Sequence, residues 1–124
     1  MNSAQAIQAF WEGFDWAAYD SSTVPSEEMN PEMPRITYDV AKAEFEAPIT
    51  ISASLWDRGY SWERISRKEE EIFNYIGLGG VLVPYDYGKL WIKRGTPFAQ
   101  RMADEDDAIR RVYLNIEVEY FTNK

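Results

Sequence analysis

The chain has 124 residues, of which 45% are hydrophobic and 15% aromatic, a composition typical of one folded domain rather than of a disordered polymer. It contains no cysteine and no histidine, which excludes disulfide bonds and thiolate nucleophiles and removes the commonest general base and metal ligand. The net charge is −8, and a globally acidic chain binds nucleic-acid phosphates poorly.

The first predicted element is an amphipathic helix near the N-terminus. Its apolar residues recur at i, i+3, i+4 and i+7, the spacing of one helix face: Ile7, Phe10, Trp11 and Phe14. Ser3 is the expected N-cap, and Gly13 is expected to weaken or end the helix.

Residues 20–34 follow as a connection without regular structure. Several Ser and Thr residues, three prolines and four acids predict an extended loop. Loops of this length inside a domain are usually functional or disordered. In an assembly, this loop would be an arm that becomes ordered on a neighbouring subunit.

Two strands and a second helix come next. Residues 36–40 alternate between apolar and polar, and residues 49–56 repeat the pattern with small hydroxyl residues on the second face. Ser61 is the expected cap of a helix over residues 62–76, which glycines beginning at Gly77 terminate.

A hairpin and a long final strand complete the predicted elements. Residues 81–84 and 89–93 form the hairpin around a turn at residues 85–88. In the last strand the core-facing set is apolar: Val112, Leu114, Ile116, Val118 and Tyr120. The intervening residues are polar or aromatic, and they face either water or a partner: Arg111, Tyr113, Asn115, Glu117 and Glu119.

These elements predict an α+β fold, with a mainly antiparallel sheet of about four to five strands and two helices packed on one face. We expect a single domain over residues 1–124. The sequence shows neither a signal-peptide pattern nor an apolar run of about 18 residues, which predicts a soluble intracellular protein.

None of the chemically suggestive clusters has the geometry of a catalytic or metal site. Four adjacent acids at residues 104–107 diverge from one loop, whereas a two-metal site needs carboxylates that converge from separate elements. A solvated turn is the favoured interpretation, and residues 69–71, all Glu, read as a helix face. The glycines at residues 77–80 precede a strand and no lysine follows them, which favours capping over a phosphate cradle. We therefore expect no catalytic activity, no cofactor and no metal.

The tryptophans divide into two groups. Trp11, Trp16 and Trp62 lie on or just after helix faces and are expected in the core. Trp56 and Trp91 lie on strand faces opposite the apolar residues. Because aromatic residues are enriched at interface centres, these two are interface candidates, with packing against a loop or stacking on a ligand as alternatives.

Charge is distributed unevenly along the chain. Residues 1–50 carry nine acids and two bases, a net −7, whereas residues 51–124 carry twelve acids and eleven bases, a net −1. The second half contains a basic set: Lys89, Lys93, Arg94, Arg101, Arg110 and Arg111. Ordinary mixed surface charge and solubility are the favoured explanation of this asymmetry. Head-to-tail contacts between copies and an acidic wall past which DNA slides are the alternatives.

Nine short segments occur in a fixed order. They are Ala-Tyr-Asp at 18–20, Val24-Pro25, Pro-Arg-Ile-Thr-Tyr at 34–38, Ser-Leu-Trp at 54–56, Ser-Trp at 61–62, Gly-Gly at 79–80, Gly-Lys-Leu-Trp-Ile at 88–92, Arg-Gly-Thr-Pro-Phe-Ala-Gln at 94–100 and Arg-Arg-Val-Tyr-Leu-Asn at 110–115. No single segment is a chemical motif, but their number and order resemble the tail terminator proteins of long-tailed phages, in the form found in Gram-positive phages and prophages. The resemblance covers roughly residues 3–122.

The resemblance implies a structural role in virion assembly and no enzymatic activity. Proteins of this kind form a ring, commonly a hexamer, that caps the tail tube at its head-proximal end, stops tube elongation and presents a surface for head–tail joining. The implied partners are further copies of the chain, the tail tube protein and a head-neck connector protein. DNA would be only a passing cargo in the lumen, no membrane would be involved, and assembly would take place in the host bacterial cytoplasm.

The resemblance and the strand patterns together give a set of candidate subunit or partner interface residues: Tyr19, Val24, Pro25, Trp56, Trp91, Pro97, Phe98, Gln100, Arg110, Arg111 and Tyr113. Arg35 departs from the family pattern, which has an aromatic residue there as often. Three other functions stay open at this point: a different neck or head-completion connector, a carbohydrate-binding module, and a small hydrolase, the last being disfavoured by the absence of His and Cys.

Overall fold

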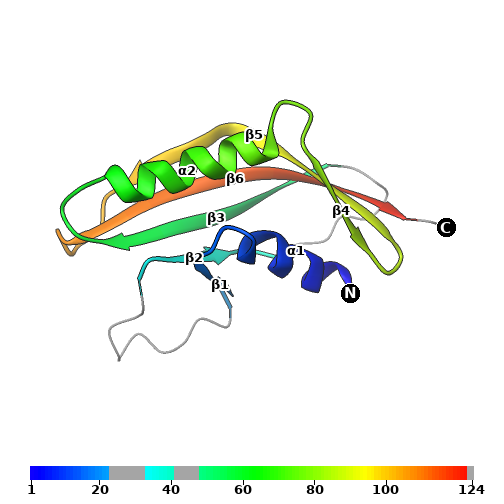
Figure 1. Ribbon diagram of the computed structural model, residues 1–124, viewed down its shortest axis with the longest axis horizontal. Coiled ribbons are helices and arrows are strands. Elements are labelled where there is room, and N and C mark those ends of the chain that lie inside the picture. Colours follow the sequence, from blue (N-terminus) through cyan, green and yellow to red (C-terminus); the bar gives the residue numbers. More distant parts are fainter. Residues whose placement is uncertain (23–32, 41–47, 123–124) are drawn as a thin grey trace.

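The computed structural model describes residues 1–22, 33–40 and 48–122. They form an α+β fold of two helices and one six-stranded sheet (Figure 1). The elements in chain order are α1 (Ser3–Glu12), β1 (Ala17–Asp20), β2 (Arg35–Tyr38), β3 (Ile49–Arg58), α2 (Glu63–Ile76), β4 (Val81–Tyr85), β5 (Gly88–Met102) and β6 (Ile109–Thr122).

The sheet is mixed, with strand order β1-β2-β3-β6-β5-β4. β1 pairs with β2 in parallel, and every other neighbouring pair is antiparallel. The predicted α+β class and the mainly antiparallel sheet are confirmed. The sheet has six strands, one more than the four to five that the sequence predicts. The missing strand is β1, whose four residues are too few to show an alternation in the sequence.

Parallel pairing of β1 with β2 requires the chain to return to the same end of the sheet before β2 begins. The connection between β1 and β2, residues 21–34, is long enough for this return, and the parallel pairing explains why a long connection is needed here. Residues 23–32 of this predicted arm lie outside the described residues, as do residues 41–47.

Alternation along the strands gives the sheet one buried face, the helix face, on which both helices pack (Figure 1). All five apolar residues predicted to face the core from β6 are buried, and Leu114 and Val118 are fully enclosed. α1 contacts both edge strands, β1 and β4, so the sheet curls around this helix. The opposite face, the outer face, carries no helix in the described part of the chain.

The helix termini differ in detail from the sequence prediction. Asn2, not Ser3, caps α1: its side chain accepts from the Gln5 N–H while the Gln5 side chain accepts from the Asn2 N–H. Ser3 lies inside the first turn and is buried, and Gly13 ends the helix as predicted. At α2 the cap residue is Trp62, although the Ser61 hydroxyl still accepts from the Glu63 N–H at 3.1 Å.

An aromatic cluster joins α1 to the sheet and to α2. Trp11 is 1% exposed and stacks on Tyr38 of β2 with centroids 6.4 Å apart, while Phe10 and Phe14 contact Tyr75 of α2. The Tyr38 hydroxyl donates to the Gln8 side chain. Burial raises the pKa of Tyr38, with the Asp20 and Glu12 carboxylates adding to the shift, so the hydroxyl stays protonated and remains a donor.

A buried carboxylate fixes the other end of α2. Asp57 of β3 is 3% exposed, and its oxygens accept from the Arg58 N–H and from the Arg64 guanidinium, whose Nε lies 2.9 Å away. This fork-like pair ties the first turns of the helix to the sheet. Closer to the middle of the helix, the Lys68 Nζ donates to the Phe14 carbonyl at 2.6 Å and lies 5.5 Å from the ring of Trp16, the partly buried tryptophan predicted for the core.

β5 is interrupted by a large bulge. Its pairing with β6 runs to Arg94↔Ile116 and resumes at Ala99↔Leu114, so residues 95–98 of β5 face only Asn115 of β6. Gly95 makes this possible, because a Cβ at that position would lie 2.6 Å from the Asn115 carbonyl oxygen. We call residues 95–98 the β5 bulge.

Gly95→Ala should therefore destabilise the protein by about 1–3 kcal/mol, since the backbone of β6 must shift to admit the methyl group. Urea unfolding followed by circular dichroism measures the difference. Gly79→Ala is the matched control, because no atom lies within 4 Å of the added Cβ, and its effect should stay within about 0.5 kcal/mol. Equal midpoints for the two variants would contradict the close approach at Gly95.

Glu69 of α2 gives the protein a pH-dependent stability. Burial raises the pKa of its carboxyl, and the Glu70 carboxylate adds to the shift. A folded-state pKa above the unfolded one means that ionised Glu69 opposes folding, and that stability is gained as pH falls through the folded pKa toward the unfolded value. Glu69→Gln should therefore raise the melting temperature at pH 7, with the gain vanishing below about pH 4.3, the ordinary glutamate pKa. Glu105→Gln in an exposed turn is the control with no gain, and a lower melting temperature for Glu69→Gln at pH 7 would refute the assignment.

Candidate functional site

The candidate site is the outer face of the sheet, where side chains from five strands line up in rows. One row runs across β1, β2, β3, β6 and β5 in register: Tyr19, Thr37, Ser54, Tyr113 and Gln100. The neighbouring row is Ala17, Arg35, Trp56, Arg111 and Met102. Strand register alone thus brings residues from both ends of the sequence onto one surface.

At the centre of these rows lies an arginine–aromatic cluster, formed by Arg35, Trp56, Arg111 and Tyr113. The guanidinium carbons of Arg35 and Arg111 lie 5.8 and 4.6 Å from the centroid of the Trp56 ring. Arg111 also lies 5.8 Å from the Tyr113 ring. Since the two arginines come from the strands on either side of β3, cations from both neighbours meet over one indole.

Hydrogen bonds hold the cluster in place. The Trp56 indole N–H donates to the Thr37 hydroxyl at 2.9 Å, and the Arg111 Nε donates to the Ser54 hydroxyl at 3.1 Å. Arg35 is 4% exposed, whereas Trp56, Arg111 and Tyr113 are half-buried and retain contact with solvent. Side chains fixed before contact lose little conformational entropy when a partner binds, which is the property of interface hot spots.

A small polar hollow of about 90 Å³ adjoins the cluster. Five of its lining side chains carry hydroxyl groups, and the charged ones are Asp39 and Arg111. The Ser21 hydroxyl donates to Asp39 at 2.7 Å. Small-molecule pockets usually measure about 300–1,000 Å³, so this hollow is suited to receive a single side chain of a partner rather than a metabolite.

Trp91 occupies the far end of the outer face. Its indole N–H donates to the Gly79 carbonyl at 2.8 Å, Lys93 lies 4.2 Å from its ring, and Phe121 lies 6.1 Å away. Lys93 also forms a 3.7 Å ion pair with Glu119 of β6. The predicted outward orientation of Trp56 and Trp91 is therefore correct, although the two lie at different ends of the face.

The structure distributes the predicted interface residues over several places. On the outer face it brings together Tyr19, Trp56, Trp91, Gln100, Arg111 and Tyr113. Pro97 is exposed in the β5 bulge, whereas Phe98 is 8% exposed and packs on Phe73 with centroids 5.2 Å apart. Arg110 lies on the helix face beside Trp62, and Val24 and Pro25 lie outside the described residues.

Three members of the site escaped the sequence analysis: Arg35, Thr37 and Ser54. The alternation of β2 contained the signal for the first two, because Ile36 and Tyr38 face the core and their neighbours must face away. Ser54 belongs to the hydroxyl face that was noted on β3. What the sequence could not show was that these residues surround Trp56, since that follows from register.

The basic set does not form one surface. Lys89, Lys93 and Arg111 lie on the outer face, while Arg94, Arg101 and Arg110 lie on the helix face. Several of these cations have local partners: Arg94 donates to the Phe73 carbonyl at 2.8 Å, and Arg110 donates to the Asp107 carbonyl at 2.7 Å. The alternative of ordinary mixed surface charge therefore describes this set better than a single basic patch.

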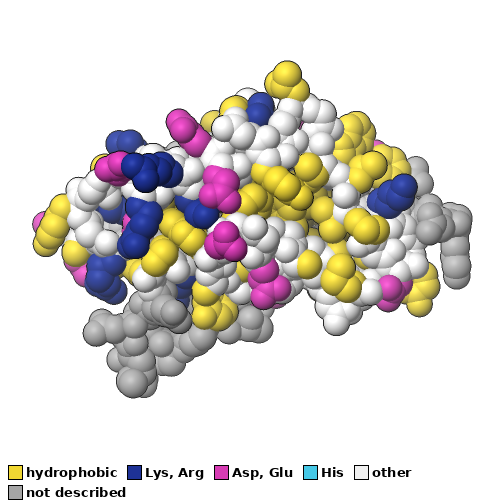
Figure 2. Space-filling view, in the orientation of Figure 1, with side chains coloured by type: hydrophobic (Ala, Val, Ile, Leu, Met, Phe, Trp, Pro, Cys, Tyr) yellow, Lys and Arg dark blue, Asp and Glu magenta, His cyan; other side chains and the backbone are white. Residues whose placement is uncertain are grey.

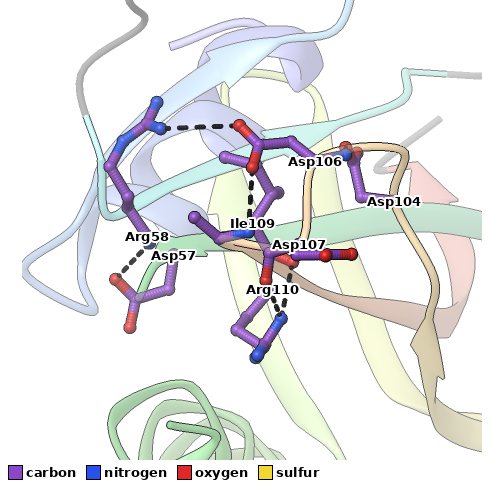
Figure 3. A network of polar contacts seen from close by, with 8 residues as sticks. Asp57, Arg58, Asp104, Asp106, Asp107, Ile109 and Arg110 are labelled. Carbon is purple, nitrogen blue, oxygen red and sulfur yellow. Dashed lines mark hydrogen bonds and ion pairs between the residues drawn. The ribbon is translucent and has the colours of Figure 1, made fainter. Parts of the chain in front are cut away.

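The acidic run at residues 104–107 forms the exposed turn between β5 and β6, as predicted (Figure 3). Asp104 and Asp106 accept from the backbone N–H groups of Asp106 and Ala108, at 2.9 and 2.8 Å. Figure 3 shows Arg58 reaching towards Asp106, with the two charged groups 4.0 Å apart. Within residues 1–22, 33–40 and 48–122, no group of three or more carboxylates could hold a metal ion.

The glycines before β4 serve turn chemistry, as predicted. Gly77 and Gly80 have φ values of 69° and 78°, and a Cβ at Gly80 would lie 2.6 Å from the Ile92 carbonyl oxygen. Among the described residues, no helix has the length and apolar character needed to span a membrane.

Comparison with known proteins does not place the chain in a family. No protein-family model matches the chain, and no curated protein matches it either. The residues of the outer face and their geometry are therefore the basis for assigning a function.

Replacing Arg111 should leave the fold intact, which makes it a suitable site for functional tests. Arg111→Met keeps the aliphatic contact with Trp56 and loses two cation–π contacts, with Trp56 and Tyr113, and one hydrogen bond, a cost of about 1–2 kcal/mol. Leu114→Ala on the same strand removes a fully buried side chain and should cost about 2–5 kcal/mol. Urea denaturation compares the two, and an equal loss in both would show that Arg111 is a core residue.

Proposed function

We propose that this protein is a ring-forming tail terminator of a long-tailed phage or prophage, which caps the tail tube, stops its elongation and provides the surface for head–tail joining. The observation that supports this best is the arginine–aromatic cluster on the outer face of the sheet. The segment order that resembles tail terminators supplies the phage context.

The chemistry of the cluster favours a protein partner. Tyr, Trp and Arg are the residues most enriched at interface centres, and here they are prepositioned by Thr37 and Ser54. Two guanidinium groups already lie over the Trp56 ring, so little of the indole is available for stacking on a sugar. This arrangement disfavours the carbohydrate-binding alternative.

The asymmetry of the sheet favours head-to-tail contacts. One edge of the sheet is β1, which pairs in parallel with β2. The other edge is formed by β4 and, where β4 ends, by the second half of β5 with its bulge. Surfaces that differ from one another associate heterologously, and such contacts close into a ring when the rotation per subunit allows it.

The charge balance suits a lumen through which DNA passes. The net charge is −8, and the ion pairs of the described residues neutralise Arg58, Arg64, Arg67, Lys68 and Lys93 locally. Tight DNA binding needs clustered, unneutralised Lys and Arg side chains. DNA would therefore slide past this protein rather than adhere to it.

The test is a tube-capping experiment with a tail tube protein from the same phage or prophage genome. Adding the protein to polymerising tubes should give shorter tubes that carry a ring at one end in negative-stain images. Arg111→Glu should abolish both effects, because it places a carboxylate in the centre of the proposed interface. Arg67→Glu, on the exposed side of α2, is the matched control and should retain both.

Two results would contradict the proposal. Tubes of unchanged length without end density for the natural protein would exclude the terminator role. Rings that bind a portal or connector protein but not the tube would instead assign the protein to the neighbouring neck components.

A further inference from the structure

An apolar groove lies on the helix side of the molecule, between α1, α2 and β4. It encloses about 280 Å³ and is lined by Ala9, Phe10, Gly13, Phe14, Tyr75, Leu82, Val83 and Pro84, without a charged residue. Tyr75 is 60% exposed, an unusually high value for a large aromatic side chain that lines a hollow. Figure 2 shows hydrophobic side chains gathered over this region.

Acidic side chains lie beside the groove. Asp15 directly follows the lining residue Phe14, and Glu71 precedes Tyr75 by one helical turn, on the same side of α2. Lys68 donates to the Phe14 carbonyl and neutralises Glu71 in an ion pair, so Asp15 supplies the remaining negative charge beside the groove. Figure 2 shows acidic groups next to the hydrophobic region, so an occupant with a basic flank would be favoured.

The β5 bulge has the complementary properties. Thr96 and Pro97 are exposed at its tip, and Arg94 and Arg101 flank it in the sequence. Phe98 anchors the bulge to Phe73 of α2, and Asn115 donates to the Pro97 carbonyl at 3.0 Å, so the bulge is tied to both α2 and β6.

The groove and the bulge lie on opposite sides of α2. Tyr75 faces α1, where it contacts Phe10 and Phe14, whereas Phe73 faces β5, where it contacts Phe98. One copy therefore presents an apolar hollow on one side and a firm, apolar projection with basic neighbours on the other. Contacts of this kind join copies head to tail.

We propose that the β5 bulge of one copy docks into the apolar groove of the next. This inference deepens the proposed function, on which it rests, by naming the contact between ring subunits. It leaves the outer face available to the tube or the neck protein.

Cysteine cross-linking tests the contact directly, because the natural chain has no cysteine. Thr96→Cys and Ala9→Cys, the latter at an exposed groove position on α1, are prepared as separate variants, one carrying a tag that changes its mass, and are mixed under mild oxidation both at high concentration and on capped tubes. A disulfide forms only where the two Cα atoms approach to about 4.4–6.8 Å. The expected result is a mixed disulfide-linked dimer in at least about ten-fold greater yield than from the control mixture of Thr96→Cys with Tyr60→Cys.

Tyr60 is a suitable control position, since it is 76% exposed and precedes α2, at the end remote from Tyr75. Equal yields in the two mixtures, under both conditions, would overturn the groove contact. If the natural protein still caps tubes in that case, the proposed function survives and only the contact is wrong. If the mixed dimer forms but no tube is capped, the contact stands and the terminator role fails.

Discussion

The antiparallel pairing of β3 with β6 decides which side chains face the core and which face outward. It joins ten residue pairs from Ile49↔Val118 to Arg58↔Ile109, through the middle of the sheet. A slip of β6 by one residue would move Val112 and Leu114 to the outer face and turn Arg111 and Tyr113 towards the core. The same register therefore specifies both the hydrophobic core and the arginine–aromatic cluster, and neither could change without the other.

The two faces of the sheet use aromatic side chains for different purposes. On the helix face, rings pack on rings, and the enclosed Trp11 links α1, β2 and the neighbouring phenylalanines. On the outer face, rings alternate with guanidinium and ammonium groups, which keep the surface hydrated while leaving flat apolar area exposed. The aromatic residues of this chain thus serve packing on one face and contact with cations on the other.

The sequence predicted best what depends on local alternation. β6, the β4–β5 hairpin and both helices follow from periodicity, and so does the outward orientation of Trp56 and Trp91. It predicted poorly what depends on distant partners. β5 was expected to end at Lys93 but extends to Met102, because its second half is stabilised by β6 rather than by any pattern of its own. Phe98, inferred from family resemblance as an interface residue, is buried because the bulge turns it towards Phe73.

The β5 bulge also determines how the sheet ends. β4 covers only the first part of β5, and from Lys93 onward the described structure places no strand on that side. An unbroken free edge of this length would invite uncontrolled pairing with other chains, the first step towards fibrils. Four residues opposite a single asparagine interrupt the ladder, so a foreign strand would find no continuous row of backbone donors and acceptors. At high protein concentration the bulge should therefore oppose the addition of further strands at this edge.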